Sequence, residues 1–322
     1  MGFACARRGT THPFGMIAFF TPSGCVLLPR SHVKLAGQIT RQKGKTMPYV
    51  TVGQENSAPI ELYYEDHGSG RPVVLIHGFP LNGRAWDRQA RALLGAGFRV
   101  ITYDRRGFGR SSQPVTGYNY DTFSADLDKL LTALDLHDVC LAGHSMGGGE
   151  IARYLGKYGS GRVQRAVIVS GIPPYLLKTP ETPTAVPQEG FDQIAAAQTA
   201  DRAAYFTEWN KNFFNLDETL GTLISAEVVQ DAWNTAVGAS PEGTIACVAT
   251  WHEDFRDDLR KIDIPVLVLH GTADNILPIE ACGPRTHELI RGSEYVPVQG
   301  AGHGLCWTHA DEVSEELLRF FK

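Results

Sequence analysis

The pentapeptide Gly-His-Ser-Met-Gly at residues 143–147 constrains the fold of this chain more than any other stretch of its sequence. The apolar run at 139–142 predicts a buried strand just before it, and apolar residues at helical spacing over 148–158 predict a helix just after it. A strand, a sharp turn and a helix in this order hold a serine exposed in a strained backbone conformation, with glycines on either side because a Cβ there would clash. The pentapeptide therefore predicts that Ser145 lies at the end of a sheet strand, placed as a nucleophile.

The segments after residue 47 alternate between strand and helix patterns, which predicts an α/β fold. Apolar and polar residues alternate over 49–65, so an antiparallel hairpin is expected to open the sheet. The later strands are continuously apolar, and we therefore expect a mostly parallel central sheet with helices on both faces. The predicted strands are 73–76, 99–103, 139–142, 166–169, 266–269 and 295–298, and the predicted helices are 86–94, 122–134, 148–158, 280–290 and 311–321.

Residues 171–262 interrupt this alternation. They begin with a proline-rich stretch and continue with aromatic and aliphatic residues at helical spacing. The region follows the carboxyl end of a strand, where open α/β sheets bind their ligands, so we expect an inserted helical cap that roofs a pocket. A lobe with a purely structural role is the alternative.

The first 46 residues differ in composition from the remainder, 47–322. They hold seven Lys or Arg and no Asp or Glu, and they lack sustained periodicity. We expect a disordered extension before a single domain, with Met47 as an alternative start of translation. A targeting segment is the competing interpretation, because an acid-poor composition is also typical of transit peptides.

Bulk composition limits the function classes. A net charge of −5 is too mild to indicate a nucleic-acid partner, and no apolar run reaches the length of about 18 residues that a membrane span needs. The six cysteines form no C-x-x-C pair and no spacing typical of metal ligands. These features predict a cytoplasmic protein with no membrane association and no structural metal.

A serine hydroxyl becomes a nucleophile only when an imidazole removes its proton, and that imidazole needs a carboxylate behind it. In a sheet of this kind the carboxylate follows the nucleophile along the chain and the histidine comes last. Asp274 follows directly after the apolar strand 266–269, and His303 lies in a glycine-rich loop after the last strand. We therefore predict that Ser145, Asp274 and His303 form a catalytic triad.

An acyl-transfer site also needs two backbone N–H groups that point at the oxygen of the tetrahedral intermediate. Met146, at the start of the helix after the serine, is predicted to supply one of them. The second should come from the loop after strand 73–76, where Phe79 is favoured over Leu81, because Pro80 between them has no N–H.

With these residues placed, the chain resembles the α/β-hydrolase superfamily. Within it, the sequence is similar to the cofactor-free bacterial haloperoxidases, also called non-haem chloroperoxidases or perhydrolases, and to the related aryl esterases. The similarity runs from about Met47 to Lys322. It is carried by five segments, which are His77–Trp86, Tyr103–Gly109, Gly143–Gly148, His270–Asp274 and Gly302–Gly304.

The resemblance implies the α/β-hydrolase fold and a serine esterase that also accepts hydrogen peroxide in place of water. Ser145 would take an acyl group from an ester or a small carboxylic acid, and peroxide would release it as a peracid that oxidises halide in solution. Haem, metal and flavin would not take part. Relatives of this kind also imply a homo-oligomer, a trimer or a hexamer.

The sequence leaves open the exact activity, the role of Pro80 and the residues of the pocket. Plain carboxylesterase or lactonase activity is the first alternative, and a receptor that uses the hydrolase fold for ligand binding is the second. Pro80 either restricts the preceding peptide and turns its own carbonyl toward the site as an acceptor for the peroxide O–H, or it only stiffens the loop. Side chains predicted to form the substrate pocket, besides Phe79 and Met146, are Pro80, Trp209, Phe213 and Trp251.

Overall fold

The structure, a computed structural model, describes residues 20–21, 24–25 and 48–322. The first four of these residues form two short antiparallel strands, β1 (Phe20–Thr21) and β2 (Gly24–Cys25). The disordered extension predicted for 1–46 otherwise lies outside the described residues. The second unit, Met47–Lys322, contains everything that follows.

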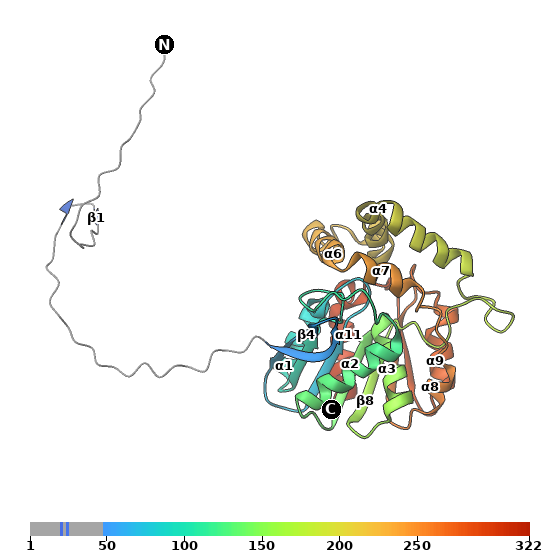
Figure 1. Cartoon of the computed structure of the whole chain (residues 1–322). Coiled ribbons are helices and arrows are strands. Elements are labelled where there is room, and N and C mark those ends of the chain that lie inside the picture. Colours follow the sequence, from blue (N-terminus) through green and yellow to red (C-terminus); the bar gives the residue numbers. More distant parts are fainter. Residues whose placement is uncertain (1–19, 22–23, 26–47) are drawn as a thin grey trace, which may run out of the picture. The chain divides into compact units, whose positions relative to one another are not determined.

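An eight-stranded sheet forms the centre of this unit (Figure 1). Its strands lie in the order β10-β9-β8-β7-β5-β6-β4-β3. Pairing is antiparallel for β3–β4 and β4–β6 and parallel for every other pair, which confirms the predicted hairpin and mostly parallel sheet. The strands are β3 (Tyr49–Glu55), β4 (Ala58–His67), β5 (Pro72–Ile76), β6 (Arg99–Tyr103), β7 (Val139–His144), β8 (Val163–Val169), β9 (Val266–Gly271) and β10 (Glu294–Val298).

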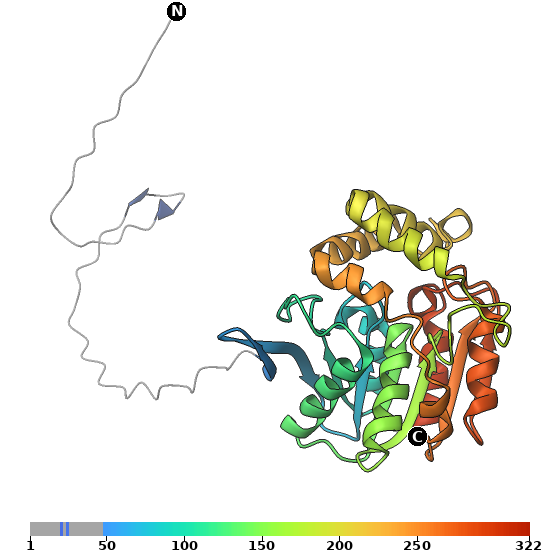
Figure 2. The same ribbon diagram turned by 45° about the vertical axis from the view of Figure 1, so that its right-hand side comes forward.

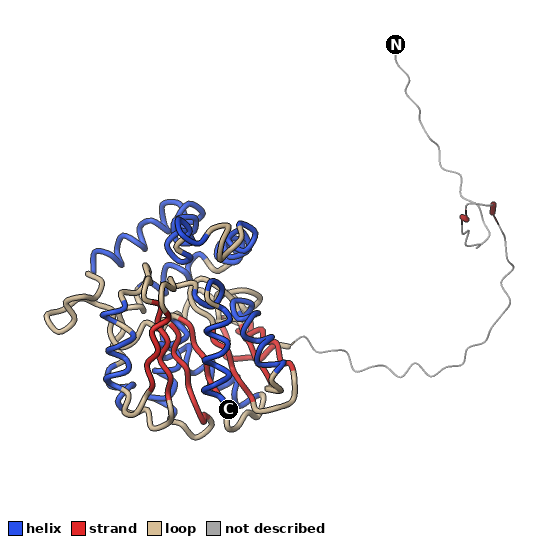
Figure 3. The backbone as a smooth tube through the Cα atoms, turned by 180° about the vertical axis from the view of Figure 1, so that it is seen from behind, coloured by secondary structure: helices blue, strands red, loops and turns tan. Residues whose placement is uncertain are grey.

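Helices cover both faces of the sheet, as its continuously apolar strands require (Figure 3). Successive residues of β7 show how the two cores arise, because Leu141 packs into one cluster while Cys140 and Ala142 pack into the other. The helices on one face are α1 (Asp87–Gly95) and α11 (Ala310–Phe321). On the other face α2 (Tyr120–Ala133), α3 (Met146–Tyr158), α8 (Arg256–Arg260) and α9 (Gly283–Leu289) pack in succession.

Helix α2 illustrates how local sequence sets these elements. The side chain of Asn119 accepts a hydrogen bond from the N–H of Thr122 at 2.8 Å, which caps the first turn. Phe123, Leu127 and Leu130 then follow at helical spacing and are fully buried.

Three short helices complete the unit, namely η1 (Gly83–Trp86), η2 (Ile279–Ala281) and α10 (Leu305–Thr308).

A helical lobe made of α4 to α7 lies over one end of the sheet (Figure 2). Its long helix is bent at Asp201, whose φ of −154° and ψ of 91° are not helical. The chain has returned to the main body by α8, since Arg153 of α3 donates to Asp258 at 2.8 Å. No helix among the described residues is long and apolar enough to cross a membrane. The lobe consists of α4 (Gln188–Phe214), α5 (Leu216–Thr219), α6 (Ala226–Gly238) and α7 (Pro241–Val248).

Replacing Leu141 by alanine tests the central position of β7. Leu141 is fully buried, so Leu141→Ala should lower the free energy of unfolding by about 2–5 kcal/mol, through lost burial and the cavity left behind. Leu220→Ala, at a side chain that is 49% exposed, should change it by less than about 0.5 kcal/mol. Denaturant unfolding measures the free energy of unfolding of both variants. Equal losses in the two would contradict the assignment of Leu141 to the core.

Candidate active site

Ser145 occupies the turn between β7 and α3 in a backbone conformation that non-glycine residues rarely adopt, with φ 56° and ψ −115°. Such a conformation costs of order 1–3 kcal/mol and persists only when its surroundings enforce it. The N–H of Ser145 donates to the carbonyl of Val169 at 2.9 Å, and its own carbonyl accepts from Gly148 at 3.0 Å and Ile172 at 3.3 Å. The turn is therefore fixed from β8 as well as from its own helix.

Close backbone approach explains the glycines around the serine. A Cβ at Gly147 would lie 2.4 Å from the carbonyl oxygen of Ile76, so α3 begins in direct contact with the end of β5. A Cβ at Gly78 would lie 2.9 Å from the Cβ of Ser145, so the loop after β5 lies directly against the serine. These contacts confirm the steric reason given for glycine on the carboxyl side of Ser145.

Asp274 and His303 are joined by a 2.7 Å hydrogen bond between Oδ2 and Nδ1, and both side chains are fully buried. The loops after β9 and β10 carry them to the same end of the sheet. The other oxygen of Asp274 accepts from the N–H groups of Ile276 at 2.9 Å and Leu277 at 2.8 Å, which fixes the carboxylate. Burial alone would raise the pKa of Asp274, but the charge of His303 and hydrogen bonds from His303 and His270 hold that pKa well below its usual range. The carboxylate is therefore ionised and orients the imidazole.

The free nitrogen of His303, Nε2, is buried and has no hydrogen-bond partner among the described residues. No hydrogen bond joins it to the hydroxyl of Ser145 in this structure. The two residues are linked instead through His144, whose Nε2 lies 2.9 Å from the carbonyl oxygen of His303. The rings of His144 and His303 lie 4.8 Å apart between centroids. Burial and the neighbouring His303 lower the pKa of His144 to about 3, so it is neutral and donates its Nε2–H to that carbonyl.

The loop after β5 presents one candidate N–H donor to the serine. Leu81 donates its N–H to the carbonyl of Gly78 at 3.1 Å and so is engaged in the turn of the loop. Pro80 has no N–H, which leaves Phe79 as the donor that the sequence also favoured. Met146 is the first residue of α3, where N–H groups have no partner within the helix.

A buried ion pair that the sequence analysis did not identify connects the two sides of this site. The guanidinium of Arg105 donates to Glu150 of α3 at 2.7 Å and to the carbonyl of His77 at 3.0 Å. Its backbone N–H donates to Nε2 of His77 at 2.9 Å, and the hydroxyl of Tyr103 contacts Glu150 from the other side. Burial raises the pKa of Glu150, although Arg105 opposes the shift. The pair ties the loop that carries Phe79 to the helix that begins at Met146.

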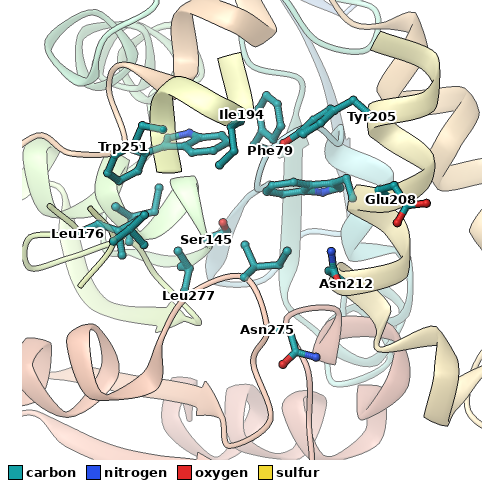
Figure 4. A pocket seen from close by; sticks show the side chains of 15 residues that line it. Phe79, Ser145, Leu176, Ile194, Tyr205, Glu208, Asn212, Trp251, Asn275 and Leu277 are labelled. Carbon is teal, nitrogen blue, oxygen red and sulfur yellow. The ribbon is translucent and has the colours of Figure 1, made fainter. Parts of the chain in front are cut away.

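A cavity of about 270 Å³ opens between the lobe and the main body, and Ser145 lies in its wall (Figure 4). Phe79, Trp209 and Trp251 line it, as the sequence predicted. Pro80, Met146 and Phe213 are not among its lining residues, although they were expected to form its walls. The complete lining is Phe79, Ser145, Ile172, Leu176, Val186, Phe191, Ile194, Tyr205, Glu208, Trp209, Asn212, Trp251, Asn275, Ile276 and Leu277.

Phe213 packs instead edge-on against the ring of His303, with 5.2 Å between the ring centroids. The end of α4 thus contacts the loops that carry Asp274 and His303. The carbonyl of Phe213 accepts from Gly304 at 2.7 Å, and the side chain of Asn215 donates to the carbonyl of Ala273 at 2.8 Å. These hydrogen bonds attach the lobe to both loops.

His270 lies with its Nε2 3.4 Å from Oδ2 of Asp274, and the carboxylate of Asp104 accepts hydrogen bonds from the N–H groups of Gly83 and Arg110, which anchor its turn. Within the described part of the chain, no group of three or more His, Cys, Asp or Glu side chains is arranged to hold a metal ion.

Comparison with known proteins places this geometry in a family. The model of the alpha/beta hydrolase fold family matches residues 71–310. A non-heme chloroperoxidase of Kitasatospora aureofaciens is 42% identical over 264 residues, covering 81% of this chain and 96% of the relative. A bifunctional esterase/perhydrolase of Acinetobacter calcoaceticus is 33% identical over 266 residues, covering 82% and 96%.

A solved structure agrees with these sequence relatives. The crystal structure of a bromoperoxidase from Bacillus anthracis superimposes with a TM-score of 0.81 at 47% sequence identity, and the match covers 84% of this chain and 98% of that one. The fold, the serine turn and these similarities lead to one conclusion: the chain is an enzyme of the α/β-hydrolase family and belongs to its group of non-haem haloperoxidases and perhydrolases.

Proposed function

We propose that this protein is a serine-dependent acyl-transfer enzyme, an ester hydrolase that also forms peracids with hydrogen peroxide. The observation that carries the proposal is the 2.7 Å pair of Asp274 and His303 beside a serine held at φ 56° in the wall of a cavity. The names of the relatives as chloroperoxidases and as an esterase/perhydrolase support the same chemistry.

In the proposed reaction Oγ of Ser145 attacks the carbonyl carbon of an ester while Nε2 of His303 takes the hydroxyl proton. Asp274 holds the ring with its proton on Nδ1 and stabilises the imidazolium that forms. The N–H groups of Phe79 and Met146 bind the oxyanion. His303 then protonates the leaving alcohol, and an acyl-enzyme remains on the serine.

The second half of the reaction decides the product. Water or hydrogen peroxide attacks the acyl carbon while His303 takes the proton of the attacking molecule, and His303 then returns a proton to Oγ of Ser145 as the ester bond breaks. Water releases a carboxylic acid, and hydrogen peroxide releases a peracid. The peracid oxidises chloride or bromide in solution to the hypohalous acid and returns to the carboxylic acid, so oxygen is transferred outside the protein.

We also place the protein in the cytoplasm as a homo-oligomer. Four cysteines of the described unit, Cys140, Cys247, Cys282 and Cys306, are buried and unpaired, which suits a reducing compartment. The trimeric or hexameric state implied by the resemblance stays a prediction.

Ser145→Ala tests the proposed nucleophile. It should lower kcat for hydrolysis of p-nitrophenyl acetate by about 10⁴-fold or more, because no oxygen remains to carry the acyl group. Ser314→Ala, on α11, removes a hydroxyl that bonds only to the carbonyl of Ala310, and it should leave the rate unchanged. Initial rates at saturating ester measure both, and turnover retained in Ser145→Ala would refute the proposal.

Pro80→Leu tests whether the loop after β5 supports peroxide chemistry. Leucine frees the backbone that proline restricts, so the carbonyl of residue 80 should no longer be held as an acceptor for the incoming peroxide. The loss of one hydrogen bond, about 0.5–1.5 kcal/mol, should lower perhydrolysis relative to hydrolysis roughly two- to tenfold. The ratio is measured as peroxide-dependent bromination of a dye against hydrolysis of the same ester. An unchanged ratio would leave Pro80 with a stiffening role alone.

A further inference from the structure

The cavity is lined mostly by apolar side chains and by one charged side chain. Aliphatic and aromatic side chains such as Ile172, Leu176 and Phe191 make up most of its wall. Lysine, arginine and histidine are absent from the 15 residues that line it. Burial raises the pKa of the Tyr205 hydroxyl, which therefore stays neutral. Glu208 is thus the one lining side chain that carries charge at neutral pH.

Glu208 lies on the lobe helix α4, on the same face as other lining residues. Tyr205, Trp209 and Asn212 stand three before, one after and four after it, which is the spacing of one helical face. Figure 4 shows the Glu208 carboxylate and Asn212 to one side of the pocket that contains Ser145. The Glu208 side chain is exposed and forms no ion pair or hydrogen bond with the described residues, while the nearby Lys211 pairs with Asp217 at 3.2 Å.

An anionic substrate meets two penalties in this cavity. The wall is mostly apolar and contains no cation, so the N–H and O–H groups of Trp209, Trp251 and Tyr205 replace only part of the water that solvates a carboxylate. The carboxylate of Glu208 adds repulsion between like charges, and no cation lines the cavity to cancel it. A neutral ester meets neither penalty, and hydrogen peroxide is also neutral.

We propose that the cavity selects acyl donors without negative charge, and that Glu208 is the specificity-determining residue that repels anionic esters and favours cationic ones. This inference rests on the proposed function, because it assumes that the esters react at Ser145. It implies that a free carboxylic acid serves as acyl donor only in its protonated form, so that esters supply the acyl group at neutral pH.

Three acetates that share one acyl group test the proposal. They are phenyl acetate, the anionic 4-acetoxybenzoate and the cationic 4-acetoxyphenyl-trimethylammonium, assayed with the full chain at pH 7.5 and low salt. Glu208→Gln should raise kcat/KM for the anion relative to phenyl acetate about two- to fivefold and lower that for the cation similarly, the range expected for exposed charges. Both changes should shrink at 0.5 M salt, where charges are screened within about 4 Å.

Glu218→Gln is the matched control, since it removes the same charge from the same lobe at a position that does not line the cavity. It should leave kcat/KM for the anion and for the cation, each relative to phenyl acetate, as in the wild type. Ratios that stay flat in Glu208→Gln, or that change equally in Glu218→Gln, would overturn the role of Glu208 while phenyl acetate is still hydrolysed. If the wild type hydrolyses none of the three esters, the proposed function is overturned, and this inference with it.

Discussion

The architecture of this enzyme depends on one tight turn, in which the backbone of Ser145 passes from β7 into α3. The left-handed φ of this residue is unfavourable in isolation, and it is retained because neighbouring strands hold the turn on both sides. The contact between Gly147 and the carbonyl of Ile76 shows how little space is left there. A parallel sheet supplies these neighbours, because the carboxyl ends of β5, β7 and β8 finish side by side.

The buried pair of Arg105 and Glu150 extends this constraint to the loop that faces the serine. Buried ion pairs contribute little net stability, because the cost of removing two charges from water offsets most of their attraction. Their geometry is nevertheless specific, and here the pair joins two defined parts of the site. One partner belongs to the nucleophile helix, and the other donates to the carbonyl of His77. The distance between the two candidate oxyanion donors is thereby set by the interior of the protein.

The main features of the fold could be predicted from sequence because local rules and global architecture agree. Apolar strands alternating with helical patterns give the sheet, and its parallel pairing follows from strands that lack polar residues. Ser145, Asp274 and His303 could be predicted to lie at one end of the sheet because each follows a strand, and their assignment as a triad stays a prediction. The contact between Asp274 and His303 needed only that β9 and β10 be neighbours, which they are.

The pocket could not be predicted to the same degree. Helical spacing identifies residues that share a face, but the bend at Asp201 and the packing of the lobe decide what that face contacts. Phe213 was expected in the pocket wall and lies against His303 instead. Glu208 was overlooked because an exposed glutamate on a helix is ordinary in sequence. Glu150 was missed for the opposite reason, since a buried acid is recognised only when its arginine is placed beside it.

The attachment of the lobe to the loops after β9 and β10 has a mechanical consequence. Phe213 and Asn215 join the end of α4 to the segments that carry His303 and Asp274, so a displacement of α4 acts directly on both segments. A lobe displaced by a bulky acyl chain would pull on the imidazole and the carboxylate together. The space under the lobe and the position of the His303 ring therefore depend on the same few hydrogen bonds.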